Sequence, residues 1–523
     1  MSSERNIESI RALEEQIKEH EPAIELKRAR NSLLNVSRLP PEILGEIFRW
    51  NVSRKTSYGQ LEKRSHNFLL VCHHWYEVAS RTPGLWGFWG DSLRDWRKRY
   101  LQHTTTPLDL VLYGGDPGWD TLDDNLRNAL KARAARDTIR QIHLTGRDSE
   151  LLNSILSSLA SCEGIRSSSV ESVVLKCDRS DELPTVSDFL AYYRFPKLQR
   201  LELRACTIRS WDFMTSKTSV LTTLILDIQP PSPTITSSQI LSILRSNPSL
   251  RKITLDGCAV PDNGCDKSSR VPLAHLRKLT VTGRSQGALA LLDQLDYSGN
   301  MDSLFLDLRD IAPGDISRIV GPYLRDYLRL REGSKIGLRL DLPSKNTLKF
   351  RVKDASINDL STNELARMHT FAEVLVQLDQ TPPQGLLEEE LLGLIAHVPQ
   401  EEIVHIEIWN CQISMEAVSN QLPYLRAITF GHMPLYIVFP ESSLDQDEIF
   451  PPLRYLRYIN LDFTWVGHGD WGSLMAFLDH LASSGNKLEK LGVEVGPYPW
   501  VDPCVEEYLR GAVREFELKY DDF

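Results

Sequence analysis

One short apolar pattern recurs along this 523-residue chain and constrains its fold more than any other feature. The pattern is an apolar residue, two variable residues, a second apolar residue, one variable residue and a third apolar residue. Its eleven copies, most of which begin 22 to 32 residues after the one before, are Ile139-Ile142-Leu144, Val170-Val173-Leu175, Leu198-Leu201-Leu203, Leu221-Leu224-Leu226, Leu250-Ile253-Leu255, Leu276-Leu279-Val281, Met301-Leu304-Leu306, Ile403-Ile406-Ile408, Leu425-Ile428-Phe430, Leu456-Ile459-Leu461 and Leu488-Leu491-Val493. Repetition at this spacing indicates an array of small units, each of which buries its apolar edge on the next.

Three of the copies extend into a longer signature. In each, a cysteine and then a β-branched residue follow at the same offset: Leu203-Cys206-Ile208, Leu255-Cys258-Val260 and Ile408-Cys411-Ile413. This signature resembles leucine-rich repeats, and the resemblance covers roughly residues 135–500. It implies an irregular α/β solenoid, a horseshoe with a parallel sheet on its concave face.

Amphipathic stretches between the triplets predict the helices that connect the strands. They are residues 150–160, 186–193, 238–245, 286–295 and 474–482. Residues 310–400 depart from the pattern and predict degenerate repeats or an insertion. The elements expected there are helices at 315–331 and 361–380 and alternating strands at 336–342 and 348–352. Residues 501–523 predict a charged helix that caps the end of the array.

Residues 37–90 carry a separate helical pattern. Two prolines open an apolar stretch at helical spacing, and a second apolar run continues from Phe68 to Trp75. So short a unit has more large apolar side chains than it can bury. An excess of this kind indicates an interaction surface.

This helical unit resembles the F-box motif. The matching residues read Leu39-Pro40-x-Glu42-Ile43-Leu44-x-x-Ile47-Phe48, then Leu70-Val71-Cys72-x-x-Trp75-x-x-x-Ala79, then Pro83-x-Leu85-Trp86. Residues 51–66 are longer than a compact F-box needs, and we interpret them as a loop. The resemblance implies docking on a Skp1-type partner, and through it on a cullin–RING ubiquitin ligase, by Leu39, Pro40, Ile43, Leu44, Ile47, Phe48, Val71, Trp75, Pro83 and Trp86. The alternative is a three-helix cap in which these side chains form only a core.

The segments beside this unit have weaker patterns. Residues 1–36 predict a helix in which Ile10, Ile17 and Ile24 fall seven apart. It either packs beside the F-box or forms a dimerisation coil. Residues 91–134 predict a linker, with a basic amphipathic helix at 91–105 and a first strand at 107–113.

Composition excludes several classes of partner. The formal net charge of −10 argues against binding to a nucleic-acid backbone. No apolar run is long enough to span a membrane, and the polar opening MSSERNIESI lacks a secretory pattern. The eight cysteines are then expected to be reduced thiols. We therefore expect a cytoplasmic or nuclear protein with no nucleic-acid or membrane partner.

No spacing of residues predicts a metal, a cofactor or a catalytic group. The cysteines lack a C-x-x-C pair and are better explained as small buried residues. The sequence from Gly467 to Gly472 fits G-x-G-x-x-G between a predicted strand and a predicted helix. However, Trp471 places a bulky ring where a pyrophosphate needs close backbone approach. A nucleotide-dependent enzyme is therefore the less favoured alternative.

The concave face of the predicted sheet is the expected binding surface. Side chains between the apolar positions point away from the core, because strand side chains alternate. The candidates for contact with a substrate protein are Arg200, Arg204, Lys252, Phe305, Trp409 and Tyr458. With the F-box resemblance, these residues predict a non-enzymatic substrate-recognition adaptor of a Skp1–cullin–F-box ubiquitin ligase. An interaction scaffold without ligase recruitment is the alternative.

Overall fold

A computed structural model describes most of the predicted array and two helices before it. The described residues are 39–53, 71–82, 88–89, 108–113, 139–146, 149–160, 169–177, 184–186, 189–190, 195–214, 220–227, 235–257, 270–297, 301–312, 314–329, 336–344, 347–354, 370–378, 386–410, 413, 418, 420–431, 458–463, 471–483, 485, 488–495 and 501–520. The chain divides into two compact units, Met1–Pro233 and Thr234–Phe523, and each is described by itself.

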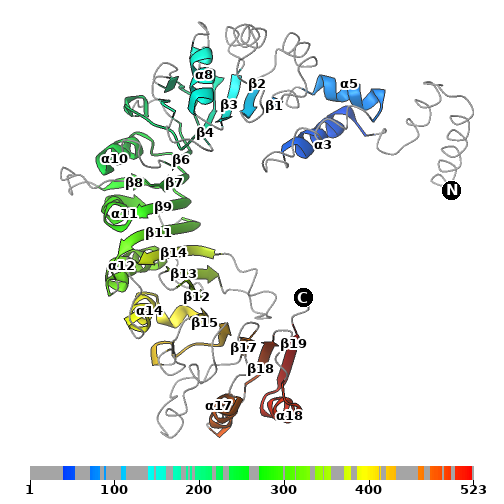
Figure 1. The fold of residues 1–523 in the computed structure, drawn as a ribbon, viewed down its shortest axis with the longest axis vertical. Coiled ribbons are helices and arrows are strands. Elements are labelled where there is room, and N and C mark those ends of the chain that lie inside the picture. Colours follow the sequence, from blue (N-terminus) through cyan, green and yellow to red (C-terminus); the bar gives the residue numbers. More distant parts are fainter. Residues whose placement is uncertain are drawn as a thin grey trace, which may run out of the picture. The chain divides into compact units, whose positions relative to one another are not determined.

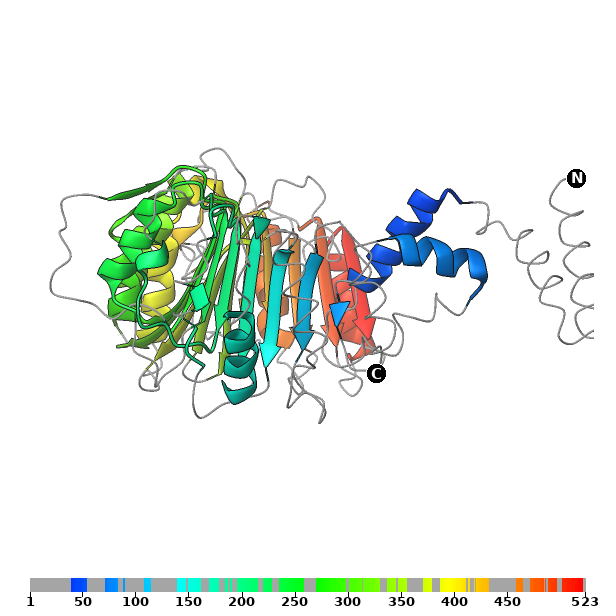
Figure 2. The same cartoon turned by 90° about the horizontal axis from the view of Figure 1, so that it is seen from above.

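The first unit contains a helical pair, α3 (Pro41–Ser53) and α5 (His73–Arg81), whose helices contact each other (Figure 2). Helix α3 begins at Pro41, where a missing N–H leaves no hydrogen bond unmade. Its inner side buries Leu44 and Phe48, and the Phe48 ring lies 5.1 Å from the Trp75 ring of α5. Helix α5 ends at Arg81, and the hydroxyl of the following residue, Thr82, donates to the Val78 carbonyl at 2.7 Å.

In the described part of the first unit, six parallel strands form a sheet in chain order (Figure 1). They are β1 (Phe88–Trp89), β2 (Leu108–Tyr113), β3 (Ile139–Gly146), β4 (Ser172–Cys177), β5 (Arg200–Arg204) and β6 (Thr223–Asp227). The triplets set the register, because Leu144, Leu175, Leu203 and Leu226 are successive partners and all are buried. Helix α8 (Ser149–Ala160) follows β3 and contacts it, as expected for a connecting helix.

The described residues of the second unit form a sheet of eleven strands. Its order is β7 (Lys252–Asp256), β9 (Lys278–Arg284), β11 (Ser303–Ile311), β14 (Thr370–Leu378), β13 (Thr347–Asp354), β12 (Ile336–Ser344), β15 (Ile403–Trp409), β16 (Ala427–Gly431), β17 (Tyr458–Phe463), β18 (Lys490–Val495) and β19 (Glu515–Tyr520). Among the pairings of the described strands, only those of β13 are antiparallel. A separate parallel pair joins β8 (Val271–Leu273) to β10 (Leu295–Tyr297). The predicted repeat strands are therefore confirmed.

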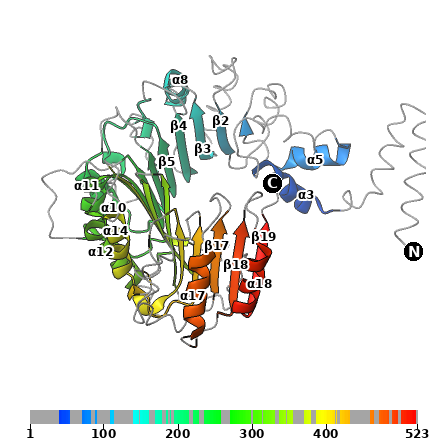
Figure 3. The ribbon, with the colours of Figure 1, turned by 60° about the horizontal axis from the view of Figure 1, so that its bottom comes forward.

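Helices lie along one face of this second sheet (Figure 3). They are α10 (Ser237–Ser246), α11 (Ser285–Leu292), α12 (Ile316–Arg329), α14 (Leu386–Ala396), α17 (Trp471–Ser483) and α18 (Pro503–Ala512). The predicted helices at 150–160, 238–245 and 474–482 are confirmed. The one predicted at 286–295 ends earlier, at Leu292. Most of the helix predicted at 186–193 lies outside the described residues. The helices predicted at 1–36 and 91–105 lie entirely outside them.

A turn of one form follows three of the strands. Ala205, Gly257 and Asn410 each come directly after a strand and have φ values of 49°, 65° and 56°. Each backbone N–H donates to a carbonyl of the next strand in the sheet, those of Asp227, Thr282 and Gly431, at 2.8, 2.9 and 3.1 Å respectively. This left-handed turn immediately precedes the three cysteines of the longer signature, so the recurring cysteine offset reflects a recurring backbone turn.

The irregular region 310–400 keeps the sheet continuous. The helix predicted at 315–331 and the strands predicted at 336–342 and 348–352 are confirmed as α12, β12 and β13. The helix predicted at 361–380 is wrong, because Thr370–Leu378 forms strand β14. There the buried residues Ala372, Val374 and Val376 alternate with the more exposed Glu373, Leu375 and Gln377, which is a period of two and not of 3.6.

Helix α14, which the sequence analysis did not predict, packs closely on α12. A Cβ atom on Gly321 of α12 would lie 2.0 Å from the His397 ring, and one on Gly393 of α14 would lie 2.6 Å from Cβ of Ser317. The buried Glu390 carboxylate of α14 accepts a hydrogen bond from the Ser317 backbone N–H at 2.6 Å. A carboxylate at a helix N-terminus is favoured by the helix dipole, so α14 caps α12.

The end of the chain differs from the predicted capping helix at 501–523. Helix α18 ends at Ala512, and β19 follows it and pairs in parallel with β18. The alternating sequence EFELKY from Glu515 to Tyr520 explains the strand. Its Glu515 and Glu517 carboxylates lie 3.0 and 2.9 Å from Nζ of Lys490 on β18.

Among the described helices none is both long and apolar enough to cross a bilayer.

Candidate interaction surfaces

The outer side of helix α3 is apolar and exposed. Ile43 and Ile47 are 49% and 46% exposed and lie four residues apart, hence on one side of the helix. Six large apolar side chains are exposed among the described residues, and four of them lie in or next to the helical pair. These four are Ile43, Ile47 and Trp50 of α3, and Val71, which precedes the start of α5 by two residues. The pair therefore concentrates the exposed apolar surface of the described chain.

The residues predicted to bind a Skp1-type partner divide into two groups. Leu44 and Phe48 are fully buried and hold the pair together, while Trp75 is half-buried against Phe48. The second group is exposed to solvent. Leu39 is partly exposed, and the more exposed residues are Pro40, Ile43, Ile47 and Val71. Pro83 and Trp86 lie outside the described residues. Trp50, which the motif did not predict, extends the spacing of Ile43 and Ile47 by one helical turn.

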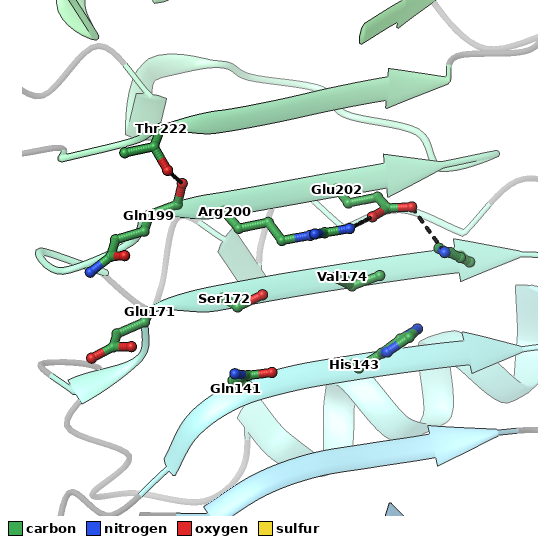
Figure 4. Close-up of a pocket in the computed structure, with 10 residues that line it drawn as sticks. Gln141, His143, Glu171, Ser172, Val174, Gln199, Arg200, Glu202 and Thr222 are labelled. Atoms are coloured by element: carbon green, nitrogen blue, oxygen red, sulfur yellow. Dashed lines mark hydrogen bonds and ion pairs between the residues drawn. The ribbon is translucent and has the colours of Figure 1, made fainter. Parts of the chain in front are cut away.

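A second candidate surface is a cavity of about 350 Å³ on the sheet of the first unit (Figure 4). It is lined by side chains of neighbouring strands together with residues just before them: Gln141, His143, Glu171, Ser172, Val174, Lys176, Gln199, Arg200, Glu202 and Thr222. Only Val174 among these is apolar. The lining therefore suits a polar or charged ligand and not an apolar one.

Glu202 is the buried centre of a charged cluster beside this cavity. Its Oε1 lies 2.9 Å from Nζ of Lys176 and 2.8 Å from Nε of Arg204, and its Oε2 lies 2.6 Å from Nη2 of Arg200. Burial alone would raise the pKa of Glu202, but the hydrogen bonds from Arg200 and Lys176 outweigh it and lower the pKa to about 2. The carboxylate therefore stays ionised and holds the three cations in place.

His143 on β3 faces the same cluster. Burial first of all, together with the nearby charges of Lys176 and Arg200, lowers its pKa to about 4 against the opposing effect of Glu202. The imidazole is therefore neutral at pH 7. A neutral ring adds a hydrogen-bonding group to the cavity wall without adding charge.

The second unit has a comparable cluster around Glu407 of β15. Its Oε1 lies 2.6 Å from Nζ of Lys353 on β13, and its Oε2 lies 3.2 Å from Nη1 of Arg339 on β12. The Arg339 guanidinium lies 4.5 Å from the centre of the Trp409 ring. A Cβ atom on Gly431 would lie 2.2 Å from that ring, so the glycine gives it room.

His405 lies two residues before Glu407 and is completely buried. Its Nε2 is 3.4 Å from Oγ1 of Thr429, and its Nδ1 has no hydrogen-bond partner in the described structure. Burial lowers the pKa of His405 to about 4, although Glu407 acts in the opposite direction. The ring is therefore neutral near pH 7.

The predicted substrate-binding residues belong to both units. Arg200 and Arg204 meet at Glu202 in the first unit. In the second unit, Lys252 is exposed, Phe305 is half-buried and Trp409 packs on Arg339. Tyr458 is the first residue of β17, and its side chain is not among those that the structure describes. Glu202, between Leu201 and Leu203, faces the cavity as strand alternation predicts, but it is buried among its cations. The sequence analysis missed Lys176, although aligning the triplets places it beside Arg204 on the next strand.

The described residues bear on the predicted absence of metal and thiol chemistry only in part. No group of three or more His, Cys, Asp or Glu side chains there is placed to hold a metal ion. Burial raises the pKa of the Cys206 thiol, which disfavours a reactive thiolate; Cys258 and Cys411 lie outside the described residues. Of the Gly467–Gly472 sequence only Trp471 and Gly472 are described, in the first turn of α17.

Comparison with known proteins gives no family. No protein-family model matches the chain, and no curated protein matches it. Among solved structures, it is similar to a chain in the crystal structure of a TLR13–ssRNA13 complex, with 12% identity and a TM-score of 0.36, over 82% of this chain and 52% of that one. It is also similar to an internalin (inlF) from Listeria monocytogenes, with 12% identity and a TM-score of 0.23, over 71% of this chain and 78% of that one. The chain spans about half the length of the first of these.

Proposed function

We propose that this protein is a substrate-recognition adaptor of a Skp1–cullin–F-box type ubiquitin ligase, acting in the cytoplasm or nucleus. In this proposal the α3–α5 pair docks on a Skp1-type partner, and the sheet of the repeat array binds a substrate protein. The observation that carries the proposal is the division of α3 into a buried side, Leu44 and Phe48, and an exposed apolar side, Ile43 and Ile47. Both sides match positions of the F-box motif.

Energetics favour a partner on the exposed side. Covering apolar surface contributes about 25 cal/mol per Å², so two half-exposed isoleucines supply on the order of 1 kcal/mol each. The buried side already stabilises the pair, since Phe48 packs on Trp75 and a Cβ atom on Gly45 would lie 2.8 Å from Oγ1 of Thr82. Docking can therefore use Ile43 and Ile47 without unfolding the helices.

The adaptor itself performs no bond chemistry in this proposal. Its contribution is to hold a lysine of the substrate near a tethered ubiquitin donor, which raises the effective concentration of the two reacting groups. This division of labour requires two separate surfaces, one for the ligase and one for the substrate. The exposed side of α3 and the polar sheet cavity supply two such surfaces.

A titration of the full-length chain with a Skp1-type partner tests the proposal. Ile43→Asp and Ile47→Asp are expected to weaken binding about 100-fold or more, because a charge would be buried at the centre of the interface. Asp at position 43 lies in the first turn of α3, where an acidic side chain is favourable, so the helix is expected to stay folded.

Val220→Asp is the matched control, because Val220 is also 49% exposed but lies outside the helical pair. It is expected to leave the affinity unchanged. No binding by the folded wild-type chain, or equal losses in all three variants, would refute the F-box assignment. Binding of the Skp1-type partner without cullin in the complex would instead favour the interaction scaffold.

A further inference from the structure

A row of hydrogen-bond donors crosses three neighbouring strands in the cavity of the first unit. Gln141 on β3, Ser172 on β4 and Arg200 on β5 are register partners, and all three line the cavity. Adjacent strands lie about 4.8 Å apart, so the row extends over roughly 10 Å. We call these three residues the donor row.

We infer that the donor row binds an anionic side chain, a carboxylate or a phosphorylated residue, in an extended segment of the substrate protein. The inference rests on the proposed function for the identity of its ligand as a substrate protein. It goes further in naming the charge of the recognised group and the residues that contact it.

Arg200 has donors to spare. Its guanidinium makes one hydrogen bond within the described structure, from Nη2 to the Glu202 carboxylate, and the side chain is 48% exposed. A guanidinium carries five N–H donors in a planar fork that matches a carboxylate or phosphate. Glu202 fixes one end of this fork, and the other donors remain available at the cavity.

The neighbours of Arg200 do not neutralise the open end of its guanidinium. Its register partners are Ser172 on one side and Thr223 on the other, both uncharged. Among the described residues, the Ser172 hydroxyl and the Gln141 amide form no hydrogen bond, so both are open to a ligand. Glu171 also lines the cavity, but its carboxylate is directed away from the Arg200 guanidinium (Figure 4).

Arg204 provides an internal comparison. It pairs with the same Glu202 and is similarly exposed, at 46%, but its register partner on β6 is the acidic residue Asp227. It is also absent from the cavity lining. Two arginines that share one glutamate therefore differ in surroundings, and only Arg200 faces neutral donors.

The test uses the full-length chain and three octapeptides that differ only in their central residue, which is glutamate, phosphoserine or glutamine. Ligand-observed NMR titration is expected to show that at least one anionic peptide binds about tenfold or more tightly than the glutamine peptide. Tighter binding of phosphoserine than of glutamate would assign the site to phosphorylated substrates, and the reverse order would assign it to acidic ones.

The variants locate the binding. Arg200→Gln is expected to remove about tenfold or more of the preference, whereas Arg204→Gln, which breaks the same kind of ion pair, changes it less than about threefold. Ser172→Glu keeps every cation and places a carboxylate inside the row, so it is expected to block the anionic peptides. The melting temperature of each variant confirms that it is folded.

Equal losses in Arg200→Gln and Arg204→Gln would overturn the inference, because binding would then follow general positive charge. Equal binding of the anionic and neutral peptides by the wild type would also overturn it. Ile43→Asp separates this result from the proposed function. It is expected to keep peptide binding while losing the Skp1-type partner, and Arg200→Gln is expected to do the opposite.

Discussion

Glu202 and Glu407 occupy the same position in the apolar pattern, yet their clusters differ in access to water. Each glutamate lies between the last two apolar residues of a triplet, is nearly fully buried, and pairs with cations. Around Glu202, the Arg200 and Arg204 side chains are about half exposed. Around Glu407, the Lys353 side chain is 7% exposed and that of Arg339 is 23% exposed.

The difference arises from what surrounds each glutamate. The partners of Glu202 lie on β5 itself and on β4, and no inserted strand interrupts the sheet there. The partners of Glu407 lie on β12 and β13, the inserted hairpin, and Trp409 stacks on Arg339 beside them. One cluster leaves donors open to a ligand, whereas the other uses its donors to join the insertion to the repeats.

Neutralising the two glutamates is expected to give the largest contrast. Glu407→Gln leaves Lys353 buried beside a neutral amide, which is expected to cost roughly 3 kcal/mol in the free energy of unfolding. Glu202→Gln is expected to cost about 1 kcal/mol, because its arginines can turn toward water. Urea denaturation of the two variants measures both values. Equal costs would show that the clusters do not differ in the way their exposure indicates.

Acidification is expected to lower the free energy of unfolding through His405, which lies beside the Glu407 cluster. The folded pKa of about 4 lies below the ordinary value of 6.5, so the folded state favours the neutral ring. The resulting stability is complete above pH 6.5 and is lost as the pH falls toward 4, by up to roughly 3 kcal/mol. His405→Phe is expected to flatten this part of the stability profile measured by urea denaturation. Glu407 and Lys353 face the ring, so a profile set by them would keep its slope in the variant.

A smaller effect is expected from filling the space beside Trp409. Gly431→Ala forces the ring from its place against Arg339 and is expected to cost about 1 to 3 kcal/mol, with a change in tryptophan fluorescence. Gly511→Ala is the control, because nothing lies within 4 Å of a Cβ atom there. Unchanged stability and fluorescence in Gly431→Ala would mean that Trp409 does not close the Glu407 cluster.

The sequence predicts the strands well because the triplets report which side chains must be buried. It predicts the irregular region less well, since residues 361–380 contain apolar residues compatible with either period until β13 is known to pair beside them. The candidate site is harder to predict than the strands. Glu202 is buried because cations from two strands surround it, which the sequence does not show. The donor row of Gln141, Ser172 and Arg200 depends on the register of β3, β4 and β5.

Amide hydrogen exchange of the full-length chain, with and without a Skp1-type partner, tests the central claim most directly. Because the proposal places the partner on the exposed side of α3, exchange is expected to slow at residues 41–53 and 71–82. Exchange at 200–204, in the sheet that carries the donor row, is expected to stay the same. Slowing confined to the sheet, or none in the helical pair at saturating partner, would contradict the proposal.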